Sequence, residues 1–260
     1  MMPDSLTANH KKSEEDHRRD ICTTGRCMYE REFIVAAEGN VSVRLDSGNI
    51  LTTPACMNKG MLKPEDLVVT DQNGLQLSGI HKASSELAMH LLIYRLRPDV
   101  NAICHAHPPT ATGFATAGRA LDEALLPEVI AGMGQVPLVP YGTPGTPELS
   151  AVLEPFVPHY DGLLLANHGA VTCGADLLTA FFRMETIEHS AKIVLVAHLV
   201  GQPVVLSQSQ VVKLVAARVR ATAQRSVLPV TLDDRQTSEH HSLAQSESDP
   251  LLRPAERRPG

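Results

Sequence analysis

The sequence has few aromatic residues and no long apolar run. It contains no tryptophan, and its aromatic fraction is only 3%. The hydrophobic core must therefore consist mainly of leucine, valine, isoleucine, alanine and methionine. No stretch reaches the roughly 18 apolar residues that a membrane-spanning helix requires, and the polar N-terminus lacks the apolar core of a signal peptide. The sequence therefore predicts no membrane partner.

Paired cysteines and excess positive charge are missing too. None of the five cysteines belongs to a C-x-x-C pair, which argues against a disulfide scaffold and favours a reduced, cytoplasmic protein. The net charge is −6 at pH 7, so no basic surface for nucleic acid is expected. What remains is a chain of 260 residues with a hydrophobic fraction of 43%, enough for one large domain with a sizeable core.

The two ends of the chain differ in composition from its middle. Residues 1–15 are charged and lack a hydrophobic period, which predicts a flexible arm. Residues 225–260 are rich in serine, glutamine, aspartate and arginine and predict a disordered tail. We expect the folded domain at residues 16–224.

Hydrophobic periodicity and turn residues predict alternating helices and strands in this domain. The predicted helices cover residues 14–37, 84–97, 110–117, 177–200 and 207–220, and another begins at Pro147 with Thr146 as its N-cap. The predicted strands cover residues 41–45, 50–53, 67–70, 100–107, 129–133, 136–139 and 162–166, the last continuing through residues 171–173.

The stretch Cys104-His105-Ala106-His107-Pro108-Pro109 ends one of these apolar strands. Side chains two residues apart on a strand point to one face, so His105 and His107 would converge on one point. Converging neutral imidazoles suit Zn²⁺ and its first-row neighbours. Two ordinary histidines at a strand end are the alternative, because a third ligand has to come from elsewhere in the chain.

His168 occupies the same kind of place, at the end of an apolar strand and just before Gly169. Three histidines with one open or carboxylate position are the pattern of a catalytic metal site. Glu86, at the start of a predicted helix, is the candidate carboxylate, and it either lies near the metal or belongs only to the helix end. The hydroxyls of Ser84 and Ser85, beside free N–H groups at that helix start, predict an anion site of the phosphate-binding kind.

Six motifs, in their order and spacing, resemble the class II aldolase/adducin family over about residues 18–220. They are GNVSVR (39–44), TPxxxxKG (53–60), SSE (84–86), HAHPP (105–109), PYGTPGT (140–146) and NHGAV (167–171). The resemblance implies a single α/β/α domain with a mostly antiparallel central sheet flanked by helices. It also implies a homotetramer with sites at the subunit interfaces.

The same resemblance implies roles for individual residues. His105, His107 and His168 match the ligands of a divalent ion such as Zn²⁺, Mn²⁺ or Co²⁺. Glu86 matches a carboxylate that binds the metal in the substrate-free site and then swings away to act as acid/base. The positions that match the phosphate site are Asn40, Thr53, Ser84 and Ser85.

Two departures from the family pattern concern the phosphate loop and the tyrosines. The family loop commonly reads TP[ST]G, whereas this chain has Thr53-Pro54-Ala55-Cys56. The fuculose-phosphate enzyme also uses two tyrosines, but here Pro127-Glu128-Val129 stands near the first position and no tyrosine follows Tyr160. In its PEVIAG setting, Glu128 resembles the base of the family's methylthioribulose-1-phosphate dehydratases. A surface residue before a strand is the alternative for Glu128.

The resemblance therefore implies a metal-dependent aldolase. Its substrate would be a ketose 1-phosphate of the L-fuculose 1-phosphate or 5-deoxypentulose 1-phosphate type, cleaved to dihydroxyacetone phosphate and an aldehyde. A sugar-phosphate dehydratase with Glu128 as its base is an alternative. A 4-epimerase is a weaker one, because such relatives carry aspartate where Glu86 stands. A non-catalytic, adducin-like interaction domain is the remaining alternative, and it would be expected to have lost metal histidines that this chain keeps.

Overall fold

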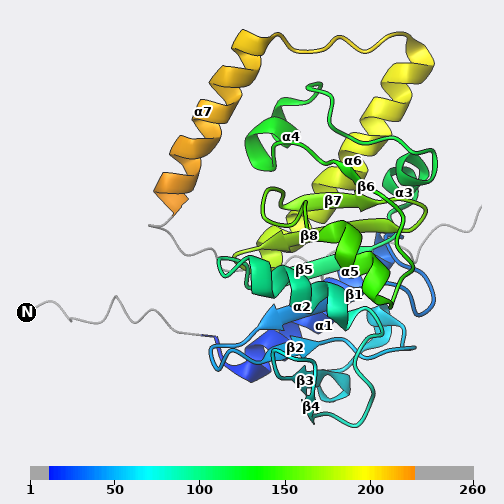
Figure 1. The fold of residues 1–260 in the computed structure, drawn as a ribbon, viewed down its shortest axis with the longest axis vertical. Coiled ribbons are helices and arrows are strands. Elements are labelled where there is room, and N and C mark those ends of the chain that lie inside the picture. The colour runs from blue at the N-terminus through cyan, green and yellow to red at the C-terminus, as the bar shows by residue number, and fades with distance from the viewer. Residues whose placement is uncertain (1–11, 226–260) are drawn as a thin grey trace, which may run out of the picture. The chain divides into compact units, whose positions relative to one another are not determined.

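The computed structural model describes residues 12–225, in which eight strands form one sheet (Figure 1). The strand order is β4-β3-β2-β1-β5-β8-β7-β6, and every neighbouring pair is antiparallel except β6 with β7. The predicted, mostly antiparallel sheet is thus confirmed. The strands are β1 Asn40–Arg44, β2 Ile50–Thr52, β3 Val68–Thr70, β4 Gln76–Ser78, β5 Ala102–Ala106, β6 Leu138–Val139, β7 Gly162–Leu165 and β8 Gly169–Gly174.

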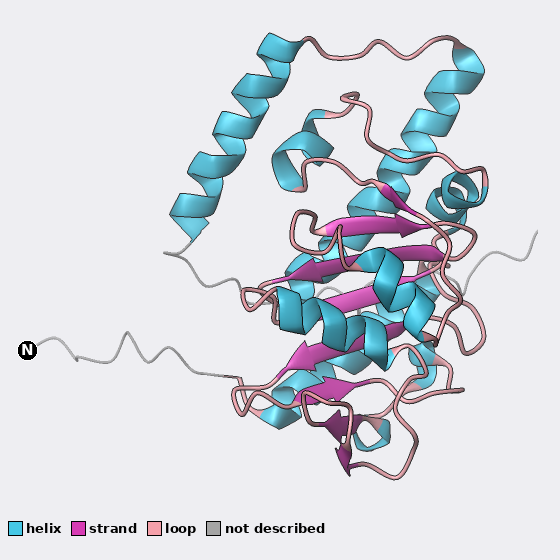
Figure 2. Cartoon of the chain, viewed as in Figure 1, coloured by secondary structure: helices cyan, strands magenta, loops and turns pink. Residues whose placement is uncertain are grey.

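Helices cover both faces of the sheet, which gives the predicted α/β/α arrangement (Figures 1 and 2). Helices α2 and α5 lie on one face, and α1 and α6 lie on the other. Among the described residues, no helix has the length and apolar character needed to cross a bilayer. The helices are α1 Glu14–Glu30, α2 Leu87–Leu96, α3 Pro109–Thr116, α4 Pro127–Gly132, α5 Pro147–Leu153, α6 Leu177–Val200 and α7 Gln208–Arg225, with short 3₁₀ turns at Lys59–Met61 and Pro64–Asp66.

Strand β5 divides its side chains between two hydrophobic cores. Ala102, Cys104 and Ala106 belong to the core under α1, α3 and α6. Ile103 belongs to the core under α2 and α5. Because side chains alternate along a strand, His105 points to the same face as Ile103. The fold therefore turns His105 toward the start of α2.

Helix α1 ends earlier than the sequence predicts. Its last residue is Glu30, not Ala37. Glu32 takes a left-handed conformation with φ of 59°, and the N–H groups of Glu32 and Phe33 donate to the carbonyls of Tyr29 and Met28. This pair of bonds is the Schellman stop that a glycine usually makes. A glutamate at that position gives no signal in the sequence, so the prediction was wrong there.

Two further elements differ from prediction. Residues 129–133 lie in α4 and its C-cap rather than in a strand, because Pro127 occupies the first turn of the helix, where its fixed φ fits and its missing N–H is not needed. Strand β7 does not continue through residue 173, because Asn167, with φ of 56°, reverses the chain into the antiparallel strand β8. The predicted arm and tail lie almost entirely outside the described residues.

A buried carboxylate on α6 holds the start of α3. Glu188 is only 1% exposed. Its two oxygens accept hydrogen bonds from the backbone N–H groups of Thr110 and Ala111, at 3.0 and 2.9 Å for the shorter contacts, and Lys192 lies 3.3 Å away. Glu188 therefore satisfies first-turn donors of α3 that would otherwise have no partner, directly after the His-Ala-His-Pro-Pro segment.

Replacing Glu188 by Ala should lower the free energy of unfolding by about 2–4 kcal/mol, since it leaves one buried and one part-buried N–H group without an acceptor. Urea denaturation measures the loss. Glu185→Ala on the same helix is the matched control, because its surface pair with Arg31 is worth at most about 1 kcal/mol. Equal losses in the two variants would contradict this role for Glu188.

Candidate metal centre and active site

Three histidines meet where the ends of β5 and β8 lie side by side. His105 is the fourth residue of β5, and His107 follows the strand by one residue. His168 is the last residue of the turn between β7 and β8. Strand β8 pairs with β5, so this turn lies beside the His-Ala-His segment. One ring nitrogen of each histidine lies within 4.8 Å of the other two.

The partners of the histidines leave ring nitrogens free for a ligand. Nδ1 of His105 donates to the carbonyl of Ala170 at 2.9 Å, and Nδ1 of His107 donates to the carboxylate of Glu38 at 3.0 Å. In the neutral rings both Nε2 atoms then carry lone pairs, and they face each other at 3.3 Å. Acceptors that face one another without a proton between them repel, and a cation placed among them removes the repulsion. This arrangement fits a metal ion whose ligands are oriented by outer hydrogen bonds.

Glu86 is the fourth member of the cluster. Its carboxylate oxygens lie 3.2 Å from Nε2 of His105 and 3.1 Å from Nε2 of His168, and the side-chain amide of Asn40 donates to it at 2.8 Å. Burial alone would raise the pKa of Glu86, but His105 and His168 hold it well below its usual range. The carboxylate is therefore an anion beside the histidines.

The histidines titrate differently because their surroundings differ. Burial, helped by His105 and His168, lowers the pKa of His107 to about 4, so this ring is neutral near pH 7. Burial also opposes the charge of His105, yet its pKa is raised because Glu86 lies against it. Neutral imidazoles and a carboxylate are the usual ligand types of a catalytic zinc site. The four residues could hold a divalent ion.

Glu86 precedes α2 instead of lying in its first turn. It is the N-cap residue, and its carboxylate makes no capping hydrogen bond. The N–H of Glu86 in turn donates to Oγ of Ser84 at 3.3 Å. The side chain of Glu86 is thus directed to the histidines and not to the end of its own helix.

Gly169 permits the close approach of the two strand ends. A Cβ atom at this position would lie 2.5 Å from the carbonyl oxygen of Ala106 and 2.6 Å from Cδ2 of His107. Real Cβ atoms do not approach other atoms so closely, so a side chain there would displace the backbone or the His107 ring. The glycine after His168 therefore has a defined packing role.

Replacing Gly169 by Ala should weaken Co²⁺ binding by about 10–100-fold, the range seen when a metal ligand loses its orientation. Titration of the metal-free protein with Co²⁺ measures this effect. Gly113→Ala is the matched control, because a Cβ there would meet nothing within 4 Å. Unchanged affinity in Gly169→Ala would show that the position of His107 does not depend on this contact.

Three of the predicted phosphate residues, Thr53, Ser84 and Ser85, lie in two adjacent loops, and Asn40 begins β1. The N–H of Ser84 donates to the carbonyl of Thr53 at 3.3 Å, and the N–H of Ala55 donates to the carbonyl of Lys82 at 2.9 Å. Within residues 12–225, the N–H groups of Cys56 and Ser85 donate to no protein group. The two loops thus bring free donors together in the manner of an anion site.

Three of the four predicted phosphate side chains are already engaged, Ser84 through its bond from the N–H of Glu86. The amide of Asn40 donates to Glu86, as described above, and Oγ1 of Thr53 accepts from the N–H of Val41 at 3.2 Å. Ser84 is half-buried and Ser85 is exposed. Cys56, which stands where the family has glycine, keeps a glycine-like backbone with φ of 56°. The cysteine therefore adopts a backbone conformation that glycine adopts more readily.

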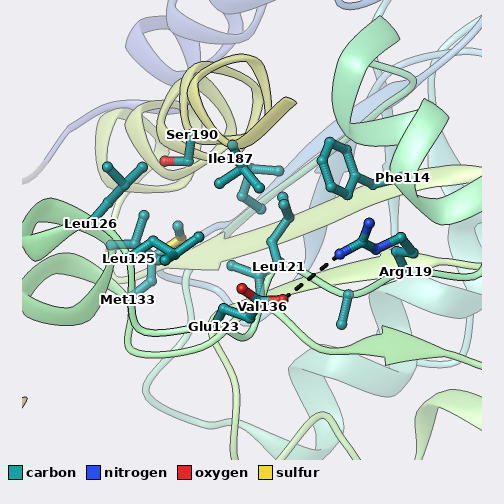
Figure 3. A pocket seen from close by; sticks show the side chains of 13 residues that line it. Phe114, Arg119, Leu121, Glu123, Leu125, Leu126, Met133, Val136, Ile187 and Ser190 are labelled. Carbon is teal, nitrogen blue, oxygen red and sulfur yellow. Dashed lines mark ion pairs between the residues drawn. The ribbon is translucent and has the colours of Figure 1, made fainter. Parts of the chain in front are cut away.

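Glu128 does not meet the cluster within the described part of the chain. It lies exposed in the first turn of α4. The next residue, Val129, lines an apolar pocket between α4 and α6 (Figure 3). That pocket shares no residue with the histidine cluster, and its charged residues Arg119 and Glu123 pair with each other at 3.7 Å. It lacks the converging polar groups that a sugar phosphate would need.

Sequence reasoning missed the groups that orient the histidines. Glu38 and the carbonyl of Ala170 hold His107 and His105, yet Glu38 lies 69 residues from its partner. No local pattern links such distant residues. A buried lysine was also missed: Lys59 donates to the carbonyl of Ala37 at 2.5 Å, and burial lowers its pKa.

Comparison with known proteins assigns the family. The family model described as "Class II Aldolase and Adducin N-terminal domain" matches residues 19–195. One relative is the 3-oxo-tetronate 4-phosphate decarboxylase of Haemophilus influenzae, with 37% identity over 174 residues, 65% of this chain and 82% of that protein. Another is the L-fuculose phosphate aldolase of Methanocaldococcus jannaschii, with 35% identity over 175 residues, 67% of this chain and 93% of that protein.

Solved structures agree with these relatives. YgbL from Escherichia coli has 30% identity and a TM-score of 0.73, with 78% of this chain and 100% of that chain covered. An L-fuculose 1-phosphate aldolase has 32% identity and a TM-score of 0.73, with 80% and 98% covered. The family match spans more than half of the sequence, and all three histidines of the motif are present and clustered. The chain therefore belongs to the class II aldolase and adducin family, as one of its enzymes.

Proposed function

We propose that this enzyme is a metal-dependent lyase that removes CO₂ from a 3-oxo-tetronate 4-phosphate and forms dihydroxyacetone phosphate. The observation that carries the proposal is the position of Glu86 between His105 and His168, beside loops with free N–H donors. The reaction type is supported by the decarboxylases of Haemophilus influenzae and Escherichia coli, which are 37% and 34% identical to this chain.

The bond changes assign each residue a task. Loss of CO₂ breaks the C1–C2 bond and leaves the electron pair on C2, which gives the enediolate of dihydroxyacetone phosphate. A divalent ion, when bound by His105, His107 and His168, supplies Lewis-acid polarisation of the substrate's oxygens. Glu86 transfers a proton that originates from solvent water to C2. Its pKa rises for this task when it leaves the histidines for a drier position.

The phosphate anchors the substrate away from the reacting carbons. We assign this anchoring to Asn40, Thr53, Ser84 and Ser85 together with the free N–H groups of their loops. Asn40 and Thr53 would contribute by shaping the loops, since their side chains already hold Glu86 and the backbone of Val41. Fixing the non-reacting end orients the bond that breaks and reduces the entropy lost on reaching the transition state.

The surroundings of the cluster favour decarboxylation over aldol cleavage. Aldol cleavage needs a second group that takes the proton of the hydroxyl next to the broken bond. Among the described residues, the carboxylates that contact the histidines are Glu86 and Glu38, and Glu38 is already hydrogen-bonded to His107. Decarboxylation needs no such second group, because CO₂ leaves without accepting a proton.

An aldolase remains the second candidate. It would cleave L-fuculose 1-phosphate or a 5-deoxypentulose 1-phosphate to the same enediolate and an aldehyde, and the L-fuculose phosphate aldolase of Methanocaldococcus jannaschii, at 35% identity, supports it. The dehydratase alternative requires Glu128 to reach a substrate, and the 4-epimerase alternative lacks its aspartate at position 86.

Assembly and location belong to the same proposal. We expect a homotetramer, which is supported by apolar side chains that stay exposed on the second half of α6, including Val196, Leu199 and Val200. All five cysteines are free thiols, which supports a reducing, cytoplasmic location. The three-histidine set with one carboxylate suits Zn²⁺, with Mn²⁺ or Co²⁺ as substitutes.

A product assay tests the function. Protein loaded with Zn²⁺, Mn²⁺ or Co²⁺ is supplied with 3-oxo-tetronate 4-phosphate or with L-fuculose 1-phosphate. We expect CO₂ and dihydroxyacetone phosphate from the first and little turnover of the second. An aldehyde with dihydroxyacetone phosphate from the second alone would assign the aldolase. Loss of water without a three-carbon product, abolished in a Glu128→Gln variant, would assign the dehydratase.

A further inference from the structure

A buried polar seam runs from the histidine cluster along β1 and α2. Alternate residues of β1 point toward α2, where residues four apart face them. The repeats match, since two residues of strand span about 6.7 Å and four residues of helix span about 6 Å. The seam consists of Asn40, Ser42 and Arg44 on β1 with Glu86, the N-cap of α2, and His90 and Tyr94 on α2. Each strand residue bonds to the residue at its level on the α2 side.

His90 is the middle member of the seam and is 1% exposed. Burial, followed by the charge of His105, lowers its pKa to about 3, so the ring is neutral. Its Nδ1 lies 2.6 Å from Oγ of Ser42, and that hydroxyl lies 2.8 Å from the hydroxyl of Tyr94. A neutral ring carries its proton on one nitrogen only, and the hydrogen-bond chain decides on which.

Only one direction of this chain satisfies both hydroxyl protons. If Tyr94 donates to Ser42 and Ser42 donates to Nδ1 of His90, both O–H groups are paired and the ring proton is on Nε2. The reverse direction leaves the hydroxyl proton of Tyr94 without an acceptor, and an unsatisfied buried donor is energetically unfavourable. The seam therefore makes Nε2–H of His90 a donor.

That donor has no partner, since Nε2 of His90 is buried without a hydrogen bond. Oε1 of Glu86 makes no hydrogen bond either, and its contact is the ion pair with Nε2 of His168 at 3.1 Å, which ends when the carboxylate leaves the histidines. Glu86 is the N-cap of α2 and His90 lies in the first turns of the same helix, so both side chains come from one end of α2.

We propose that His90 is a positioning residue for Glu86, and that its Nε2–H donates to the carboxylate when substrate oxygens displace Glu86 from His105 and His168. The inference rests on the proposed function, in which Glu86 leaves the histidines to carry a proton. The bond gives the displaced carboxylate one defined place beside the reacting carbon. Ser42 and Tyr94 act behind it by fixing the tautomer.

Two substitutions distinguish the role of Nδ1 of His90 from the role of Nε2. His90→Asn keeps an amide group near the position of Nδ1 and removes the distal donor, whereas His90→Gln places an amide N–H near the position of Nε2. We expect His90→Asn to lower kcat by about 10–100-fold, the loss expected for a hydrogen bond to a charged group, with KM and Co²⁺ affinity within about twofold of wild type. We expect His90→Gln to recover most of kcat.

A wild-type kcat in His90→Asn would overturn the inference, as would a fall in kcat that parallels a fall in Co²⁺ affinity. The tautomer of His90 tests the inference by a measurement that needs neither substrate nor variants. In ¹⁵N NMR spectra of the metal-free wild type, His90 should carry its proton on Nε2, and a proton on Nδ1 would overturn the inference even in an active enzyme. An Nε2–H tautomer in a protein that turns over neither sugar phosphate would instead mean that the proposed function fails.

Discussion

Replacing Glu86 by Gln is expected to lower kcat by about 10²–10⁴-fold, the contribution of a well-placed general acid or base. Glutamine keeps the size of the side chain and can still accept from Asn40, but it cannot carry the proton to the enediolate carbon. The three histidines are untouched, so the metal should remain bound. Steady-state kinetics, together with metal analysis of the same sample, separates these two effects.

The control for this variant is Glu185→Gln, whose side chain pairs with Arg31 at 2.6 Å on α6 and lies outside the cluster. It should retain wild-type kcat and metal content. If Glu86→Gln turns over at the wild-type rate, another group must move the proton. If it loses its metal as well as its activity, Glu86 acts as a permanent ligand and not as the mobile acid/base proposed here.

Replacing His105 by Ala is expected to abolish metal binding at stoichiometric concentrations, with a loss in affinity above about 100-fold, because even an outer-sphere partner contributes 10–100-fold. His105 is fully buried and its orientation is fixed by the carbonyl of Ala170. Among the described residues, the candidate metal-binding group consists of His105, His107 and His168. Titration with Co²⁺ followed by its visible spectrum measures the loss.

The matched control is His159→Ala, because His159 is exposed and lies against Tyr160 outside the cluster. It should bind Co²⁺ as the wild type does. Full metal occupancy in His105→Ala would contradict a site shared by the three histidines. Partial occupancy with an altered Co²⁺ spectrum at a large excess of Co²⁺ would still agree with it, since two histidines and Glu86 would remain.

The sequence predicts the parts of this site that depend on local pattern. His105 and His107 are two residues apart at a strand end, and this period alone indicates that they share a face. The apolar stretch 162–165 before His168 indicates a second strand end. The pattern does not predict the reversal of the chain at Asn167. Its backbone is left-handed, a conformation that a glycine in the sequence would have suggested. That turn, rather than a continuous strand, brings His168 to β5.

The supporting groups are harder to predict because their contacts are distant in sequence. Glu38 reaches His107, and Glu188 reaches Thr110, across 69 and 78 residues. Helix ends such as that of α1 depend on a glutamate in an unusual conformation. Such contacts follow from the packing of the whole sheet, so only the folded chain reveals them. The seam behind Glu86 belongs to this class as well.

The central claim is that Glu86, next to the three histidines, moves a proton on the enediolate carbon of dihydroxyacetone phosphate. Incubation of metal-loaded enzyme with dihydroxyacetone phosphate in D₂O tests this claim. The test applies equally to the decarboxylase, whose other product is CO₂, and to the aldolase, whose other product is an aldehyde. Proton NMR should show that one hydrogen of the hydroxymethyl group exchanges for deuterium in the wild type, and that Glu86→Gln slows the exchange by about 10²–10⁴-fold. Absence of exchange in the wild type, or an equal rate in Glu86→Gln, would contradict the claim.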